Sequence, residues 1–83
     1  MGRKQFSKQE AESKRGRAIR SLGEFPGVPK GTTGHVVDLE EMGRAGFAVV
    51  VEWDVPRRQF TAKQEPIRDW FTKDEYERFL VEG

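Results

Sequence analysis

Cysteine is absent from the chain, and histidine occurs once, at His35. Without cysteine the protein has no disulfide framework, no thiolate-bound zinc or iron–sulfur site and no cysteine nucleophile. A lone histidine lacks the partner groups of a metal or catalytic site, so we expect it to be structural or exposed. Glu52 and Asp54 share one strand face, and we expect a solvated strand end there. The sequence therefore predicts a protein that is not an enzyme, with no catalytic residues, no bound metal and no cofactor.

Long apolar runs are missing as well. No stretch approaches the roughly 20 apolar residues of a membrane-spanning helix, and the first residues lack the apolar centre of a secretory signal. We therefore expect a cytoplasmic protein without membrane contact.

The 83 residues suffice for one small domain. Hydrophobic and charged residues each make up 35% of the chain, so the apolar residues of a core must be concentrated in a few segments.

Charge is divided unevenly between the start of the chain and the rest. Residues 1–20 contain seven Lys or Arg and two Glu, a net charge of +5, whereas the other 63 residues have a net charge of −4. The first 15 residues include only Met1 and Phe6 as large apolar residues, too few to offset the cost of ordering the backbone, about 1–2 kcal/mol per residue. We expect a disordered basic arm over 1–15 and a domain over 16–83. Ser7 and Glu10 have the spacing of a helix capping box, which leaves a short frayed helix as the alternative.

The clearest strand in the sequence lies at 47–54. Phe47, Val49, Val51 and Trp53 recur at every second position, which predicts that one face of this strand is core and that Trp53 is buried. Further strands are expected at 17–22, 33–39, 59–63 and 67–71. Two prolines and two glycines at 24–31 predict an ordered loop. The chain is therefore mainly β.

The end of the chain has the signals of a helix. Thr72 and Glu75 have capping-box spacing, and Phe71 with Tyr76 fits a hydrophobic staple. One apolar stripe with helical spacing follows, made of Tyr76, Phe79 and Leu80. We predict a helix over 73–82 that packs this stripe against the sheet.

Four or five short strands with one helix are too few for a sandwich, and they predict a small closed or half-open barrel with a C-terminal α-helix. The segment Lys30-Gly31-Thr32-Thr33-Gly34-His35-Val36 resembles the Lys-Gly-x-x-Gly-x-Val turn of KOW-type barrels, which joins their first two strands. This resemblance to KOW-type SH3-like barrels covers residues 16–63, and it implies a small SH3-like barrel that binds nucleic acid. Residues 25–38 are more weakly similar to the NifZ family of nitrogen-fixation accessory proteins, in a Phe-Pro-Gly followed by Gly-x-Val-Val-Asp.

Docking on another protein in a cytoplasmic assembly is the function that we expect first. The loop at Phe25 and Pro26 would expose apolar groups on a stiff backbone, and two arginines follow the third strand. The candidate partner-binding residues are Phe25, Pro26, Arg57 and Arg58. Trp70 could join such a surface, but we expect it to seal one end of the barrel, because so small a core needs its large aromatic residues.

Nucleic-acid binding is the alternative from a different class. Arginines near aromatic side chains suit phosphate contacts combined with base stacking. The candidate contacts are Arg15, Arg17, Arg20 and Lys30, together with Arg57 and Arg58. The net charge of −4 over residues 21–83 opposes this alternative. A third alternative, from the NifZ resemblance, is an accessory protein of metallocluster assembly.

Overall fold

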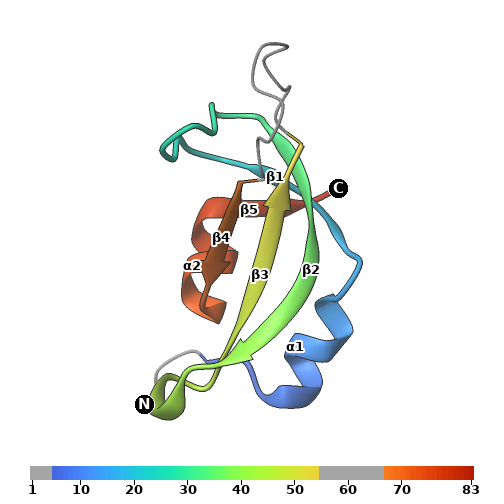
Figure 1. Ribbon diagram of the computed structural model, residues 1–83, viewed down its shortest axis with the longest axis vertical. Coiled ribbons are helices and arrows are strands. Elements are labelled where there is room, and N and C mark those ends of the chain that lie inside the picture. The colour runs from blue at the N-terminus through green and yellow to red at the C-terminus, as the bar shows by residue number, and fades with distance from the viewer. Residues whose placement is uncertain (1–4, 55–66) are drawn as a thin grey trace.

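The computed structural model describes residues 5–54 and 67–83, which form five antiparallel strands and two short helices (Figure 1). The strands are β1 (Ala18–Ser21), β2 (Thr33–Glu41), β3 (Phe47–Trp53), β4 (Arg68–Phe71) and β5 (Leu80–Glu82). The helices are α1 (Lys8–Lys14) and α2 (Lys73–Phe79), and a 3₁₀ turn, η1, spans Gly43–Ala45. Neither α1 nor α2, the α-helices of the described residues, has the length and apolar character needed to cross a membrane.

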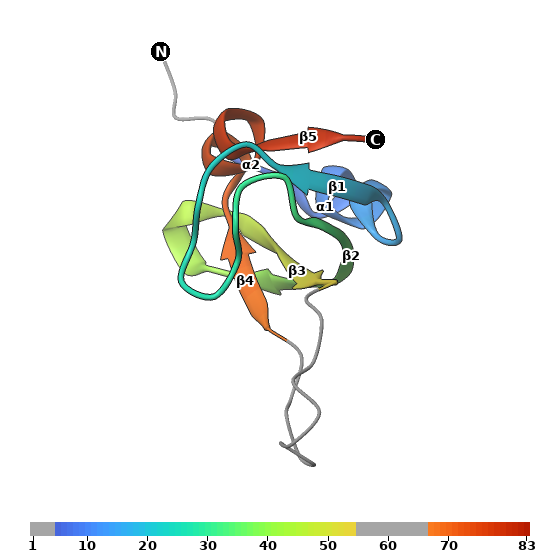
Figure 2. The same ribbon diagram turned by 90° about the horizontal axis from the view of Figure 1, so that it is seen from above.

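The fold is mainly β, as predicted, but the sheet is not closed into a barrel. The strands lie in the order β4-β3-β2-β1-β5, and over the described residues no ladder joins the edge strands β4 and β5. Figure 2 shows β1 and β5 on one side and β3 and β4 on the other, with β2 bending between them. Because α2 connects β4 to β5, the chain passes between the two edges as a helix. The strand expected at 59–63 lies outside the described residues.

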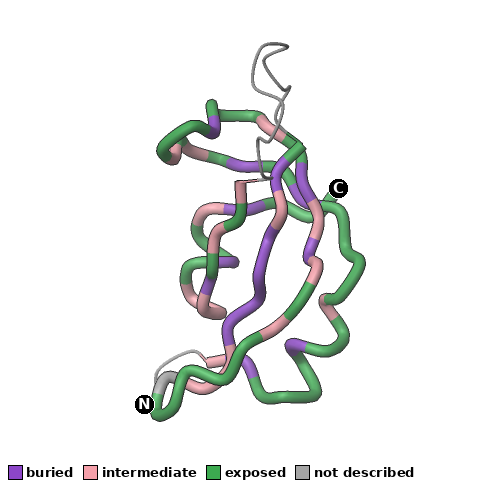
Figure 3. The backbone as a smooth tube through the Cα atoms, in the orientation of Figure 1, coloured by how far each residue is buried: buried purple, intermediate pink, exposed green. Residues whose placement is uncertain are grey.

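The core lies along β3, which is buried over most of its length (Figure 3). Val49 and Val51 are fully buried and Trp53 is 3% exposed, so the predicted inward face and the core position of Trp53 are confirmed. The indole N–H of Trp53 donates to Asp69 Oδ2 at 2.8 Å, which satisfies its polar atom inside the core. The other buried members of the core cluster come from nearly every element: Phe6, Ala11, Ile19, Val28, Val36, Phe71, Tyr76 and Leu80.

A β-bulge in β2 decides which side chains reach the outer face of the sheet. The pairing of β2 with β3 shifts register between Val36 and Asp38, so Val37 is an extra residue without a partner. Strict alternation would place Asp38 on the same inward face as the buried Val36. The bulge instead pairs Asp38 with Val50 on the outer face and returns Leu39 to the core, against which it packs.

The connection from β1 to β2 depends on two glycines and one buried serine. Gly31 has a φ of +89°, a region that glycine adopts without strain. A Cβ atom at Gly34 would lie 2.7 Å from the carbonyl oxygen of Glu52, so the strands approach closely only because this residue is glycine. The buried hydroxyl of Ser21 accepts the Gly31 N–H at 3.0 Å and donates to the Pro29 carbonyl at 3.1 Å, which fixes the connection to β1.

The structure corrects the expectation of a disordered arm over 1–15 for the residues that it describes there. Ser7 and Glu10 form a complete capping box, each side chain accepting the backbone N–H of the other at 3.1 Å. Phe6 is 3% exposed and Ala11 is fully buried, and the Phe6 carbonyl accepts the N–H of Phe47 at 3.1 Å. These two apolar side chains enter a core that the rest of the chain supplies, and their burial helps to offset the entropy cost of ordering the segment.

The predicted C-terminal helix starts where expected but ends early. Thr72 and Glu75 form the predicted capping box, and α2 ends at Phe79 instead of at residue 82. Residues Leu80–Glu82 are the strand β5, in which Val81 pairs with Arg20 of β1. Helical spacing continues past Phe79 in the sequence, but the free edge of β1 provides these residues with backbone partners in a different geometry.

Trp70 does not seal the sheet, which corrects the expectation for its side chain. In β4 the neighbouring Phe71 is 4% exposed and points into the core, whereas Trp70 is 49% exposed. Because successive residues of a strand face opposite sides, the inward placement of Phe71 turns Trp70 outward.

Candidate functional site

An exposed indole ring with charged neighbours marks the outer face of β2, β3 and β4. Asp38 pairs with Val50, and Val50 pairs with Trp70, so these three side chains form one row across the strands. Glu40 and Arg68 lie on either side of this row and complete a surface that we name the Trp70 face: Asp38, Glu40, Val50, Arg68 and Trp70. Together with Val37 and Leu39 these residues line a cavity of about 360 Å³.

The indole of Trp70 is held in place at its edge. Its N–H donates to Glu40 Oε1 at 2.6 Å, and its cross-strand neighbour Val50 is 6% exposed. The polar atom of the ring is therefore satisfied within the protein, and the exposed part of the indole is its aromatic surface. A ring fixed in this way loses less conformational entropy on contact with a ligand than a freely rotating one.

The cation of the Trp70 face has its own counter-ion. Arg68 donates from Nε and Nη2 to Glu52 Oε1 at 3.2 and 3.1 Å, and the two residues are direct partners across β3 and β4. In the described part of the chain no Lys or Arg forms an ion pair with Asp38 or Glu40. The charge of the face that remains without a counter-ion is therefore negative.

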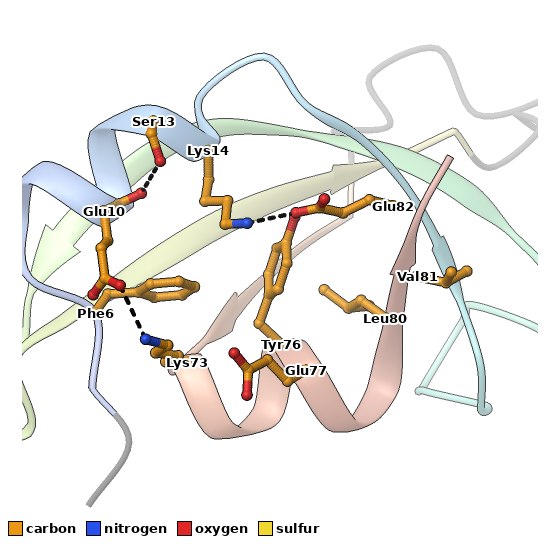
Figure 4. A pocket seen from close by; sticks show the side chains of 10 residues that line it. All are labelled: Phe6, Glu10, Ser13, Lys14, Lys73, Tyr76, Glu77, Leu80, Val81 and Glu82. Carbon is orange, nitrogen blue, oxygen red and sulfur yellow. Dashed lines mark hydrogen bonds and ion pairs between the residues drawn. The ribbon is translucent and has the colours of Figure 1, made fainter.

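A larger cleft, of about 620 Å³, separates α1 from α2 and β5 (Figure 4). The rings of Phe6 and Tyr76 meet there edge to face, with their centroids 5.6 Å apart, and Leu80 also lines the cleft. Since Phe6 precedes α1 and Tyr76 belongs to α2, this aromatic contact joins the N-terminal segment to the end of the chain.

The charged side chains around this cleft are bonded to one another. Lys73 donates to Glu10 at 3.0 Å, and Lys14 donates to Glu82 at 2.6 Å. The Tyr76 hydroxyl also donates to Glu82, at 2.9 Å, and burial raises the pKa of Tyr76 well above its usual value. These contacts attach α1 to the rest of the domain. The cleft therefore marks the internal contact of α1 with α2 and β5, and the polar groups named above are engaged in bonds within the protein.

The attachment of α1 is expected to weaken in acid. Hydrogen bonds hold the pKa of two carboxyl groups below the ordinary value of 4.5, chiefly the bond from Lys14 for Glu82 and the bond from the Ser7 N–H for Glu10. Because these pKa values are lower in the folded state, their stabilising contribution is present above pH 4.5 and is lost as the pH falls through the folded values. Melting temperatures of the wild type and of Glu82→Gln between about pH 7 and 3 test this. The variant is expected to have a lower melting temperature than the wild type at neutral pH, and its melting temperature is expected to fall less as the pH is lowered. Parallel curves of melting temperature against pH would contradict the prediction.

The predicted partner-binding residues have different placements. Phe25 is half-buried, and its backbone pairs with Val28 through two hydrogen bonds of 2.9 and 2.8 Å. Its ring contacts the core rings of Trp53 and Phe71 and the half-buried ring of Phe79. Pro26 is exposed. Arg57 and Arg58 lie outside the described residues. The structure gives the Phe25 ring an internal role, and its contact with a partner stays a prediction.

The candidate nucleic-acid contacts lie away from the Trp70 face. Arg15, Arg20 and Lys30 are exposed, on or near β1, and β2 and β3 separate β1 from β4 in the sheet. Arg17 donates to Glu82 Oε1 at 3.5 Å, and Glu82 is the residue of β5 that also binds Lys14 of α1. Arg15 precedes β1, Arg20 belongs to it and Lys30 lies in the connection to β2, so these three cations are spread along β1 and its flanking segments.

The carboxylates and the histidine of the strand ends form no compact site. His35 Nδ1 lies 3.9 Å from Asp54 Oδ1, and the two side chains are 45% and 57% exposed. Glu52 binds Arg68 on the neighbouring strand. Over residues 5–54 and 67–83 no group of three or more His, Cys, Asp or Glu side chains is placed to hold a metal ion.

The hydrophobic staple at the start of α2 is a sequence signal for the exposed position of Trp70. The staple between Phe71 and Tyr76 predicts that Phe71 faces the core, and both residues do belong to the core cluster. Applied to β4, the two-residue alternation then places Trp70 on the opposite side.

No family model, curated protein or solved structure matches this chain. Its structure defines a small mainly β protein with a five-stranded antiparallel sheet and two short helices.

Proposed function

We propose that the protein is a non-enzymatic interaction module that docks on another protein through the Trp70 face. The observation that carries the proposal is the Trp70 ring, 49% exposed and yet fixed by its hydrogen bond to Glu40. Tryptophan is among the residues that contribute most to protein interfaces, because it buries a large area with few rotatable bonds. A fixed, exposed tryptophan beside a cavity is therefore a suitable centre for a partner contact.

The arrangement of strands supports the finer interpretation of the fold as a partly open relative of the SH3-like barrel. The order β4-β3-β2-β1-β5, with a helical segment between β4 and β5, places the first strand between β2 and the last strand. A Lys-Gly-x-x-Gly-x-Val turn that leads into β2 agrees with the KOW resemblance. Small β folds of this kind have many functions, so the fold itself does not select between partners.

Selection from a random peptide library displayed on phage tests the docking proposal. We expect enriched peptides that bind the wild type and lose about tenfold or more in affinity on Trp70→Ala, the size expected for an interface hot spot. Leu22→Ser is the matched control, because Leu22 is 47% exposed and lies outside the Trp70 face. Peptides that bind Trp70→Ala as tightly as the wild type would contradict the proposal.

Nucleic-acid binding remains the second candidate, and the exposure of Arg15, Arg20 and Lys30 favours it. None of the three forms an ion pair with another described residue. Fluorescence anisotropy with single-stranded RNA and duplex DNA at low salt decides this candidate. Binding through phosphates would give a log–log salt slope of about −0.7 to −0.9 per contact, and no binding at low salt would remove it. The NifZ alternative rests on residues 25–38 alone and stays a prediction.

A further inference from the structure

We infer that the Trp70 face binds an arginine side chain in a basic segment of a partner protein. This inference rests on the proposed function, because it names the chemistry of the partner at the same surface. The aromatic surface of Trp70 and the carboxylates of Asp38 and Glu40 are its three components. They border a single cavity of about 360 Å³, a size at the low end for ligand pockets that suits one side chain.

The indole surface favours a cation. The faces of an aromatic ring are electronegative, and tryptophan attracts cations more strongly than the other aromatic residues do. Since the indole N–H of Trp70 is already bonded to Glu40, the exposed part of the ring offers no free donor that would attract an anion. The buried Val50 beside it adds an apolar contact for the methylene stem of a long side chain.

The carboxylates supply the complementary charge. Asp38 Oδ1 accepts the N–H of Leu39 at 2.8 Å, and Oδ2 has no hydrogen bond to another described residue. Glu40 uses Oε1 for Trp70. Arg68 does not neutralise these groups, because its donors are directed to Glu52. A basic side chain above Trp70 would therefore find two carboxylates of β2 in the lining of the same cavity.

Arginine fits this arrangement better than lysine. Its guanidinium group is planar and stacks on an indole, and its five N–H donors can serve two carboxylates at once, whereas lysine is a compact point charge. A nucleic-acid base could also stack on Trp70, but the phosphates beside it would be repelled by Asp38 and Glu40. The observations thus favour a basic protein segment over a nucleic acid at this surface.

NMR titration with four short Gly/Ser peptides that differ at one central residue tests the inference. The central residues are arginine, its uncharged isostere citrulline, lysine and leucine. We expect the arginine peptide to shift the indole signal of Trp70 while that of the buried Trp53 stays in place. Replacing arginine by citrulline is expected to weaken binding about tenfold, with lysine in between.

Variants with one charge removed separate a specific site from general electrostatic attraction. Asp38→Asn is expected to weaken binding of the arginine peptide severalfold, whereas Glu24→Gln, an exposed acid in the loop after β1, is expected to have little effect. Equal losses in both variants would overturn the inference. Shift mapping on the wild type needs no variant, so a failure of Asp38→Asn to fold would not remove the test.

The outcomes distinguish this inference from the docking function on which it rests. If the leucine peptide shifts Trp70 as strongly as the arginine peptide, the face docks protein and the arginine specificity is wrong. If single-stranded RNA shifts Trp70 and the peptides do not, both the inference and protein docking at this face are wrong. If no peptide shifts Trp70, the inference is overturned, and the phage selection alone decides the docking function.

Discussion

Replacing Phe6 by alanine is expected to destabilise the protein by about 3–5 kcal/mol. Phe6 is 3% exposed, its ring contacts Tyr76 edge to face, and its carbonyl bonds the first residue of β3. An 83-residue domain has a total stability of about 4–12 kcal/mol, so this single change would remove a large part of it. Urea denaturation of the wild type and Phe6→Ala, followed by circular dichroism, measures the effect as a shift of the midpoint.

Leu22→Ala is the matched control for this experiment. Leu22 is 47% exposed, so its truncation is expected to change stability by no more than about 0.5 kcal/mol. Phe6→Leu retains most of the apolar volume and should lie between the wild type and Phe6→Ala. If Phe6→Ala unfolds at the same urea concentration as the wild type, the N-terminal segment does not contribute to the core.

Trp53→Ala is expected to cost a similar amount, about 3–5 kcal/mol, and so to remove a large part of the stability of the domain. Trp53 joins β3 to the aromatic contacts of Phe25 and Phe71, and its indole N–H is bonded to Asp69. Differential scanning calorimetry measures the loss as a lower melting temperature.

Two further substitutions separate the packing of Trp53 from its hydrogen bond. Trp53→Phe keeps an aromatic ring and removes the donor to Asp69, so it is expected to cost less than Trp53→Ala. Trp70→Ala removes an indole of the same size from the outer face and is expected to have a small effect on stability. Equal losses for Trp53→Ala and Trp70→Ala would contradict the different positions of the two tryptophans.

Much of the local structure could be predicted from the sequence because its causes are local. Both capping boxes depend on two side chains three residues apart. The box at Thr72 forms as predicted, and the box at Ser7 forms the helix that the sequence offered as the alternative to disorder. The alternation through β3 places one row of large side chains in the core whichever residues pack against them. The predicted burial of Trp53 is therefore confirmed.

The candidate site was less accessible to prediction. Phe25 was expected at a contact surface, but its ring completes an aromatic cluster whose other members come from distant parts of the chain. The row from Asp38 to Trp70 depends on the bulge at Val37 and on the pairing of three strands. A register shift of one residue reverses which face a side chain occupies, and sequence periodicity does not specify it.

The sequence by itself determined where the C-terminal helix begins, which strand is central to the core, and that the protein is mainly β. Those features arise from residues close together along the chain, whose spacing sets hydrogen bonds and burial directly. Only the tertiary structure decided that Phe6 and Ala11 are core, that Leu80–Glu82 form a strand, and that Trp70 faces solvent. Each of these depends on a partner remote in sequence, because burial and strand pairing are completed only when distant segments meet in space.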